Sequence, residues 1–171
     1  MSKRSGDRPA EATEERGIDE LIGGGHTVAM VMTMVGDAHT SRPVTCVEVT
    51  HDRLSFLVSR EVEWVADIAS GRATTVHVTV ADEKANTYLS LEGRATITND
   101  QAEARRLWTP MAKVWFDGPD DPRLAAMHFS VAGGQYWDGP SGSVRQGINL
   151  VRAIIEGDES VLGTSGPVST V

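Results

Sequence analysis

Apolar residues alternate with polar ones over most of the chain, in short runs that end at glycine, proline or aspartate. A period of two is typical of β-strands with one buried face, and apolar residues on both alternating sets predict a strand covered on both faces. Such runs predict strands at residues 26–35, 40–49, 54–59, 74–81, 87–98, 124–131 and, as the start of a last strand, 135–137. The run at 26–35 is apolar on both sets, so we expect it at the centre of the sheet.

Short helices are predicted between these strands. Apolar spacing, capping residues and closing glycines place them at residues 18–22, 62–69, 100–107 and 110–115, with a C-terminal helix around 148–155. Gly93 inside a strand predicts a bulge or a close approach of two backbones, whereas Gly133-Gly134 predicts a turn. Long helices do not alternate with the strands, so the fold class is predicted to be mainly β with short helices (α+β), as a barrel or closed sheet.

The length of 171 residues is that of one domain with a buried core. Residues 1–16 are rich in charge with little to bury, and they are predicted to form a mobile N-terminal arm. The predicted domain spans residues 17–156 and includes the C-terminal helix. The small polar residues 157–171 are predicted to form a flexible tail.

Composition narrows the classes of partner. A net charge of -8 argues against nucleic acid, because phosphate binding needs a basic face. Neither a membrane-spanning apolar run nor a secretion signal is found, so a cytoplasmic protein is expected. Cys46 is the only cysteine, which excludes a disulfide framework. The histidines lack metal spacing, and we expect His128 to be a structural histidine and Asp121 to belong to a turn with Asx hydrogen bonds.

A series of short motifs stands in a fixed order along the chain. They are Ser41-Arg42-Pro43-Val44, Phe56-Leu57-Val58-Ser59, the segment 62–68, Leu107-Trp108, Trp115-Phe116, the turn at 118–122 and Tyr136-Trp137-Asp138. In this order the chain resembles the FMN-binding split barrels related to pyridoxamine 5'-phosphate oxidase, in the branch of bacterial general stress proteins. The resemblance implies a six-stranded antiparallel split β-barrel that pairs as a homodimer, with two flavin sites in the grooves between subunits.

The resemblance also implies how the flavin is held. Arg42, followed by Pro43, stands where the family's arginine contacts the FMN phosphate. Backbone groups near Val58 and Ser59 would face the flavin ring. The alternative for Arg42 is a surface arginine paired with a carboxylate of this acidic chain.

The family pattern breaks at two positions. Where the family has a serine and a lysine that bind phosphate, this chain has Val62 and Trp64. Valine offers no hydrogen-bond donor and tryptophan offers only its indole N–H, although a buried phosphate dianion needs several donors or cations. Arg60 is two residues away and is a candidate to replace the missing lysine. Trp64 is expected either to stack on a ring system or to pack against Ile68 in the core or a dimer interface.

Tryptophans are the remaining candidates for the ligand groove. Aromatic side chains at Trp115 and Trp137 would line it, and together with Trp108 they would sandwich a flat ligand. The alternative is that these side chains pack in the core or the dimer interface.

Two classes of function follow. The first is an FMN-dependent oxidoreductase that acts on a small molecule in a stress-related role, with no general acid or base identified among the residues. The second is a split-barrel dimer that has lost FMN through the changes at Val62 and Trp64. Such a dimer would bind another ligand, such as deazaflavin or haem, or would be non-catalytic.

Overall fold

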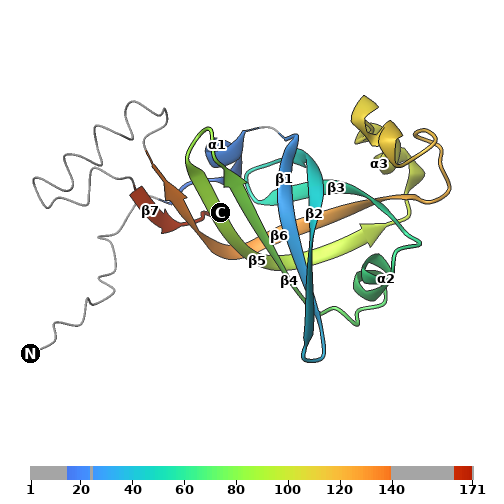
Figure 1. The fold of residues 1–171 in the computed structure, drawn as a ribbon, viewed down its shortest axis with the longest axis horizontal. Helices are drawn as coiled ribbons and strands as arrows, with labels where there is room; N and C mark the ends of the chain where they lie inside the picture. The colour runs from blue at the N-terminus through green and yellow to red at the C-terminus, as the bar shows by residue number, and fades with distance from the viewer. Residues whose placement is uncertain (1–14, 24, 140–163, 171) are drawn as a thin grey trace, which may run out of the picture.

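The computed structural model describes residues 15–23, 25–139 and 164–170. Six antiparallel strands form a closed barrel with a few short helices, as predicted (Figure 1). The strands are β1 (Thr27–Val35), β2 (Ala38–Val49), β3 (Arg53–Ser59), β4 (Thr75–Asp82), β5 (Thr87–Thr98) and β6 (Leu124–Asp138). Their order is β3-β2-β1-β4-β5-β6, and a further pairing of β3 with β6 closes the ring. Alternating apolar side chains from all six strands fill the interior.

β6 is the strand that makes closure possible. Its first half pairs with β3, from Ser59 opposite Leu124 to Arg53 opposite Ser130, while β5 pairs along its other edge. Beyond Ser130, β6 no longer pairs with β3, and a short strand, β7 (Thr164–Pro167), pairs with the last residues of β6. One long strand therefore belongs to the closed barrel at one end and to a three-stranded edge at the other.

Helices lie at the ends and on the outside of the barrel. α1 (Ile18–Ile22), α2 (Glu63–Ala69), α3 (Gln101–Arg106) and the 3-10 helix η1 (Pro110–Val114) confirm the four predicted helices to within one or two residues. α2 packs Val65 and Ile68 into the main core. α3 and η1 enclose a second apolar cluster outside β3 and β6; its members are Ala104, Ala112, Phe116 and Leu124, with Leu57 and Trp108 packed against them.

Glycines bring β5 and β6 close together. A Cβ added at Gly93 would lie 2.1 Å from the carbonyl oxygen of Ser130, and one at Gly134 would lie 2.5 Å from that of Ser90. The register also shifts between Glu92 and Gly93, which confirms the predicted bulge or close approach. The predicted turn at Gly133-Gly134 is wrong, since β6 runs through both residues. The two glycines serve close strand packing here instead of chain reversal.

Gly93→Ala is expected to lower the free energy of unfolding by about 1–3 kcal/mol, because the new methyl group collides with backbone that cannot turn away. Gly118→Ala is the matched control, since an added Cβ there meets nothing within 4 Å. Urea unfolding of both variants measures the difference. Equal stability of the two variants would show that the barrel relaxes around the added atom.

The outer face of β1 departs from the prediction. β1 is central, between β2 and β4, as expected, and Ala29, Val31 and Thr33 on its inner face are buried. On the outer face, however, Val28 is 58% exposed and Met30 is 40% exposed. Burial on both faces is therefore wrong for the single chain, because no described element covers this side of the strand.

Residues 164–170 of the predicted C-terminal tail are described by the structure and include a short strand. Residues 164–167 form β7, and Val168 is buried in the main core. Arg16 pairs with Val168, and its guanidinium Nη1 donates to Asp138 Oδ2 at 2.7 Å. Pairing with β7 gives backbone groups on the edge of β6 their hydrogen-bond partners. Residues 1–14 of the predicted arm, residues 157–163 and 171 of the predicted tail, and the predicted C-terminal helix lie outside the described residues.

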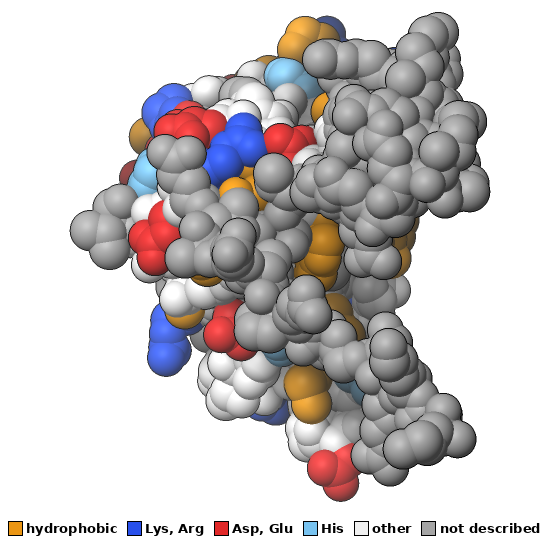
Figure 2. Space-filling model, turned by 90° about the vertical axis from the view of Figure 1, so that its left-hand side faces the viewer, with side chains coloured by type: hydrophobic (Ala, Val, Ile, Leu, Met, Phe, Trp, Pro, Cys, Tyr) orange, Lys and Arg blue, Asp and Glu red, His pale blue; other side chains and the backbone are white. Residues whose placement is uncertain are grey.

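The charge of the described surface is mixed on the face that Figure 2 shows. Acidic and basic side chains lie side by side there, with apolar side chains between them (Figure 2). Within the described ranges, no helix has the length and apolar character needed to cross a membrane.

Candidate functional site

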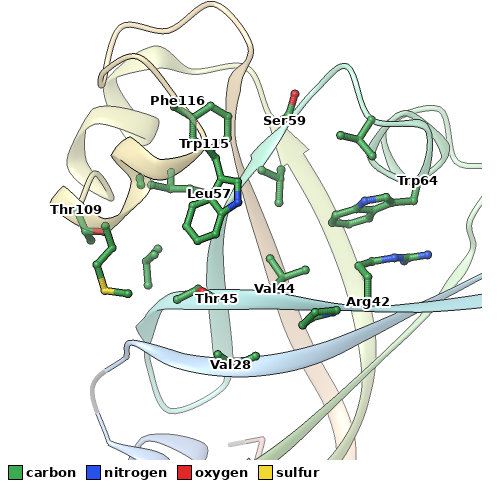
Figure 3. A pocket seen from close by; sticks show the side chains of 16 residues that line it. Val28, Arg42, Val44, Thr45, Leu57, Ser59, Trp64, Thr109, Trp115 and Phe116 are labelled. Atoms are coloured by element: carbon green, nitrogen blue, oxygen red, sulfur yellow. The ribbon is translucent and has the colours of Figure 1, made fainter.

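A cavity of about 630 Å³ opens beside β2, β3, α2 and η1 (Figure 3). Its volume is typical of sites for small molecules and cofactors. The residues that line it are Val28, Arg42, Pro43, Val44, Thr45, Val47, Leu57, Val58, Ser59, Val62, Trp64, Thr109, Met111, Ala112, Trp115 and Phe116. Most of these side chains are apolar, and Arg42 is the one charged side chain among them.

The cavity lies where the pairing between β2 and β3 stops. β2 pairs with β3 through Cys46, Glu48 and Val49, but the ladder does not continue to the stretch of β2 that holds Arg42. β3 meanwhile continues through Val58 and Ser59 along β6, so its other edge is free of a strand partner at these residues. An open edge offers backbone N–H and C=O groups to a ligand. The split of the barrel therefore forms the groove in which the cavity lies.

Six of the sequence-predicted site residues come together in this groove. They are Arg42, Pro43, Val58, Ser59, Trp64 and Trp115. Trp64 from α2 and Trp115 from the end of η1 lie on opposite sides of the cavity, and Arg42 extends beneath Trp64 (Figure 3). Trp115 is 60% exposed, so its indole forms an open wall instead of core.

The other two predicted residues lie elsewhere. Arg60 turns toward β6, where its Nη2 donates to the carbonyl oxygen of Leu124 at 2.6 Å, and it does not line the cavity. A role for Arg60 in place of the family lysine stays a prediction, and this arrangement does not favour it. Trp137 lies near the β7 end of β6, opposite Tyr88 of β5, and is 45% exposed.

Arg42 is held by polar and aromatic neighbours. Its Nη1 donates to Thr33 Oγ1 at 2.9 Å, and its Nη2 donates to Thr40 Oγ1. Its guanidinium carbon lies 4.8 Å from the centre of the Trp64 ring. Partial burial lowers the pKa of Arg42 from its ordinary value, because the charge loses part of its hydration. Among the described residues Arg42 forms no ion pair, so the surface pairing considered for it is not the arrangement found.

Sequence reasoning missed the residues that support Arg42 and part of the cavity wall. Thr33 and Thr40 face each other across β1 and β2, two positions from the pairing of Val31 with Arg42. The available signal in the sequence was Thr33, a polar residue at an inward position of an apolar strand. Met111 reaches the cavity from η1 and belongs to no motif, so only the fold brings it there.

A second polar cluster lies under α3. Ser55 Oγ and His128 Nδ1 are 3.0 Å apart, and His128 Nε2 is 3.3 Å from Glu103 Oε1. Arg106 binds both Glu103 and Glu48. This resembles a nucleophile with its base, but the side chain of Ser55 is fully buried and no substrate reaches it. His128 is therefore a structural histidine with partners, as predicted.

Burial lowers the pKa of His128, and the nearby Arg53 guanidinium adds to the effect, while Glu103 opposes it. The folded protein then binds fewer protons at this site than the unfolded chain does. Stability from His128 is present above about pH 6.5 and is lost as the pH falls through the lower folded pKa. We therefore expect the wild type to be more stable than His128→Gln at about pH 7.5, and the free energies of unfolding of the two proteins to converge as the pH falls to about 5. Parallel pH profiles would contradict this.

Two other groups have structural roles. Asp121 accepts hydrogen bonds from the backbone N–H groups of Asp117 and Arg123, which confirms the predicted Asx turn. The Arg123 guanidinium holds the pKa of Asp121 well below its usual range. Burial raises the pKa of the Cys46 thiol to about 11, so this side chain is inert near neutral pH. Over the described ranges, no group of three or more candidate ligand residues is placed to hold a metal ion.

The closed barrel and the cavity beside its split are the features of a split-barrel protein. The chain belongs to the family described as pyridoxamine 5'-phosphate oxidase like, whose sequence pattern matches residues 13–160. This confirms the resemblance seen in the motifs. No curated protein matches the chain in sequence.

Solved structures share the fold. A candidate general stress protein 26 from Jannaschia sp. CCS1 is 19% identical, with a TM-score of 0.70 over 84% of this chain and 90% of that chain. The general stress protein 26 of Bacillus anthracis str. Sterne is 22% identical, with a TM-score of 0.60 over 70% of this chain and 89% of that chain. The general stress FMN/FAD binding protein of Xanthomonas citri is 22% identical, with a TM-score of 0.58 over 68% of this chain and 83% of that chain.

Proposed function

We propose that this protein binds FMN in the groove beside Arg42 and is a cytoplasmic, FMN-dependent oxidoreductase acting on a small molecule. The observation that carries the proposal is Arg42, which among the described residues is the one cation lining an apolar cavity with aromatic sides and forms no ion pair. An arginine without a carboxylate partner in such a place is suited to a ligand that brings its own anion. The FMN/FAD binding described for the Xanthomonas citri structure supports the same choice.

The residues present fit FMN part by part. Apolar walls formed by residues such as Val44 and Val58, with Trp115 at the side, suit a flat ring system. The free edge of β3 offers backbone groups to the polar rim of the ring. Arg42 is the residue that would hold the phosphate. When bound, the flavin supplies the hydride or electron chemistry.

The chain's own contribution is binding, orientation and exclusion of water. Arg42 fixes one end of the ligand, and the apolar walls remove water from its flat faces. Val62 gives the phosphate no donor, and Glu61 and Glu63 beside it are exposed and do not line the cavity. Phosphate binding therefore depends on Arg42 more heavily than in a site with a second cation.

We also propose that two copies pair over the open side of the groove. Val28, Met30, Val62, Met111 and Trp115 are exposed apolar side chains on or beside the groove. Apolar surface gathered in this way is typical of an interaction site. A second copy would cover these side chains and shield the ligand from water.

Absorbance of the freshly purified full chain tests the proposal. Flavin bands in the visible range, with free FMN recovered after denaturation, are the expected result. A colourless protein that takes up no added FMN would overturn the proposal and favour the split-barrel dimer without flavin.

A further inference from the structure

The Arg42 guanidinium is restrained from three directions. Thr33 on β1 and Thr40 on β2 each accept a hydrogen bond from one of its terminal nitrogens. Trp64 on α2 covers it with an indole ring, 4.8 Å from the guanidinium carbon to the ring centre. Thr33 is 3% exposed, and Trp64 packs against the main core, so two of the three supports are themselves anchored.

None of these supports neutralises the charge. Several described arginines have a carboxylate within ion-pair distance, and they are Arg16, Arg72, Arg105, Arg106 and Arg123. Arg42 forms no such pair with any described residue, although the chain is acidic. A guanidinium has five N–H bonds, and two hydroxyl contacts leave others free. The structure thus fixes a cation at the cavity wall and keeps donors available.

We propose that Trp64 is a positioning residue for Arg42: its indole holds the guanidinium by a cation–π contact, so that the free N–H groups meet the phosphate of FMN. This rests on the proposed function. Trp64 stands where the family has its phosphate-binding lysine. By fixing Arg42, it supports phosphate binding through one cation where the family has two. Trp64 acts through Arg42 and is not itself a phosphate ligand.

The competing explanation is that Trp64 is only a wall of the cavity. A wall contacts the ring and sugar of a flavin, which FMN and riboflavin share. A positioning residue affects the phosphate alone, and its effect requires Arg42. The two flavins therefore separate the two roles, since they differ only in the phosphate.

The experiment measures dissociation constants of FMN and riboflavin by quenching of flavin fluorescence, at one ionic strength, with the full chain. The proteins are the wild type, Trp64→Leu, Trp64→Phe, Arg42→Ala and the double variant Arg42→Ala with Trp64→Leu. Trp64→Leu is expected to weaken FMN by about threefold to thirtyfold. Riboflavin binding should change less than about twofold, the range of a neutral surface substitution. Trp64→Phe, which keeps a ring, should retain most of the affinity, and Trp64→Leu should add nothing once Arg42 is alanine.

A second readout works without flavin. A proton above an aromatic ring is shifted upfield, so the Arg42 side-chain N–H resonances of the free protein should move when Trp64 becomes leucine and stay nearly in place when it becomes phenylalanine. Arg42→Ala assigns these resonances by their loss.

Each result has one meaning. Equal weakening of FMN and riboflavin by Trp64→Leu, or an undiminished effect in the Arg42→Ala background, would overturn the positioning role while the proposed function stands. A wild type that binds neither flavin would overturn the proposed function. In that case the contact between Trp64 and Arg42 is tested by the Arg42 side-chain N–H resonances alone. If these resonances do not move in Trp64→Leu, the inference is overturned as well.

Discussion

Arg42→Ala is expected to raise the dissociation constant of FMN by about tenfold to a hundredfold, because hydrogen bonds to a charged group contribute about 1.5–3 kcal/mol. Among the described residues Arg42 is the one charged side chain that lines the cavity, and Val62 and Trp64 give the phosphate no second cation. Riboflavin lacks the phosphate, so its affinity should change little. Titration of both flavins against the variant measures the effect.

Arg94→Ala is the control for this variant. Arg94 is exposed on β5 and does not line the cavity, so the substitution removes the same charge without touching the site. It should shift FMN affinity only slightly, through the overall field of the protein. If Arg94→Ala weakens FMN as much as Arg42→Ala does, net charge and not the Arg42 contact controls binding.

Val28→Asp is expected to prevent the proposed pairing of two copies and to leave the chain monomeric. Val28 is 58% exposed on the outer face of β1 and also borders the groove, so a proposed partner copy would bury it. Burial of an unpaired carboxylate is strongly unfavourable, and the variant should leave the chain as a single copy. Light scattering after gel filtration should show a mass that falls from twice 18.4 kDa to 18.4 kDa.

Ala102→Asp is the matched variant for dimerisation. Ala102 is exposed in the first turn of α3, where a new carboxylate is compatible with the helix end. It adds the same charge away from the groove and should leave the dimer intact. A wild type that is already monomeric, or a Val28→Asp variant that remains dimeric, would contradict pairing over this face.

Much of the fold was predictable from sequence because the alternation of apolar residues along the chain matches the inward faces of the strands in the barrel. Val76, Val78 and Val80 alternate in the chain and are buried together. The turn expected at Gly133-Gly134 was wrong because glycine has two uses, chain reversal and close approach, and only the partner strand distinguishes them. Exposure of β1 was missed because an apolar strand has the same pattern whether its own fold or a second copy covers it.

The site was predictable where a residue type and its motif coincide. Arg42 follows from the Ser-Arg-Pro motif, and the structure places it at the cavity. Its supports did not follow, since the contacts of Thr33, Thr40 and Trp64 depend on strand register and on the seating of α2. Arg60 was suggested as a phosphate ligand because it is close in sequence to Val62. Sequence distance does not fix the direction of a side chain, and Arg60 turns to the backbone of β6.

The most direct test of flavin binding is an equilibrium titration of the wild-type full chain with FMN, followed by flavin fluorescence. Saturable quenching with one FMN per chain, and weaker quenching of riboflavin, is the expected result. Absence of saturable quenching at FMN concentrations up to about 1 mM would mean that the groove does not hold this cofactor.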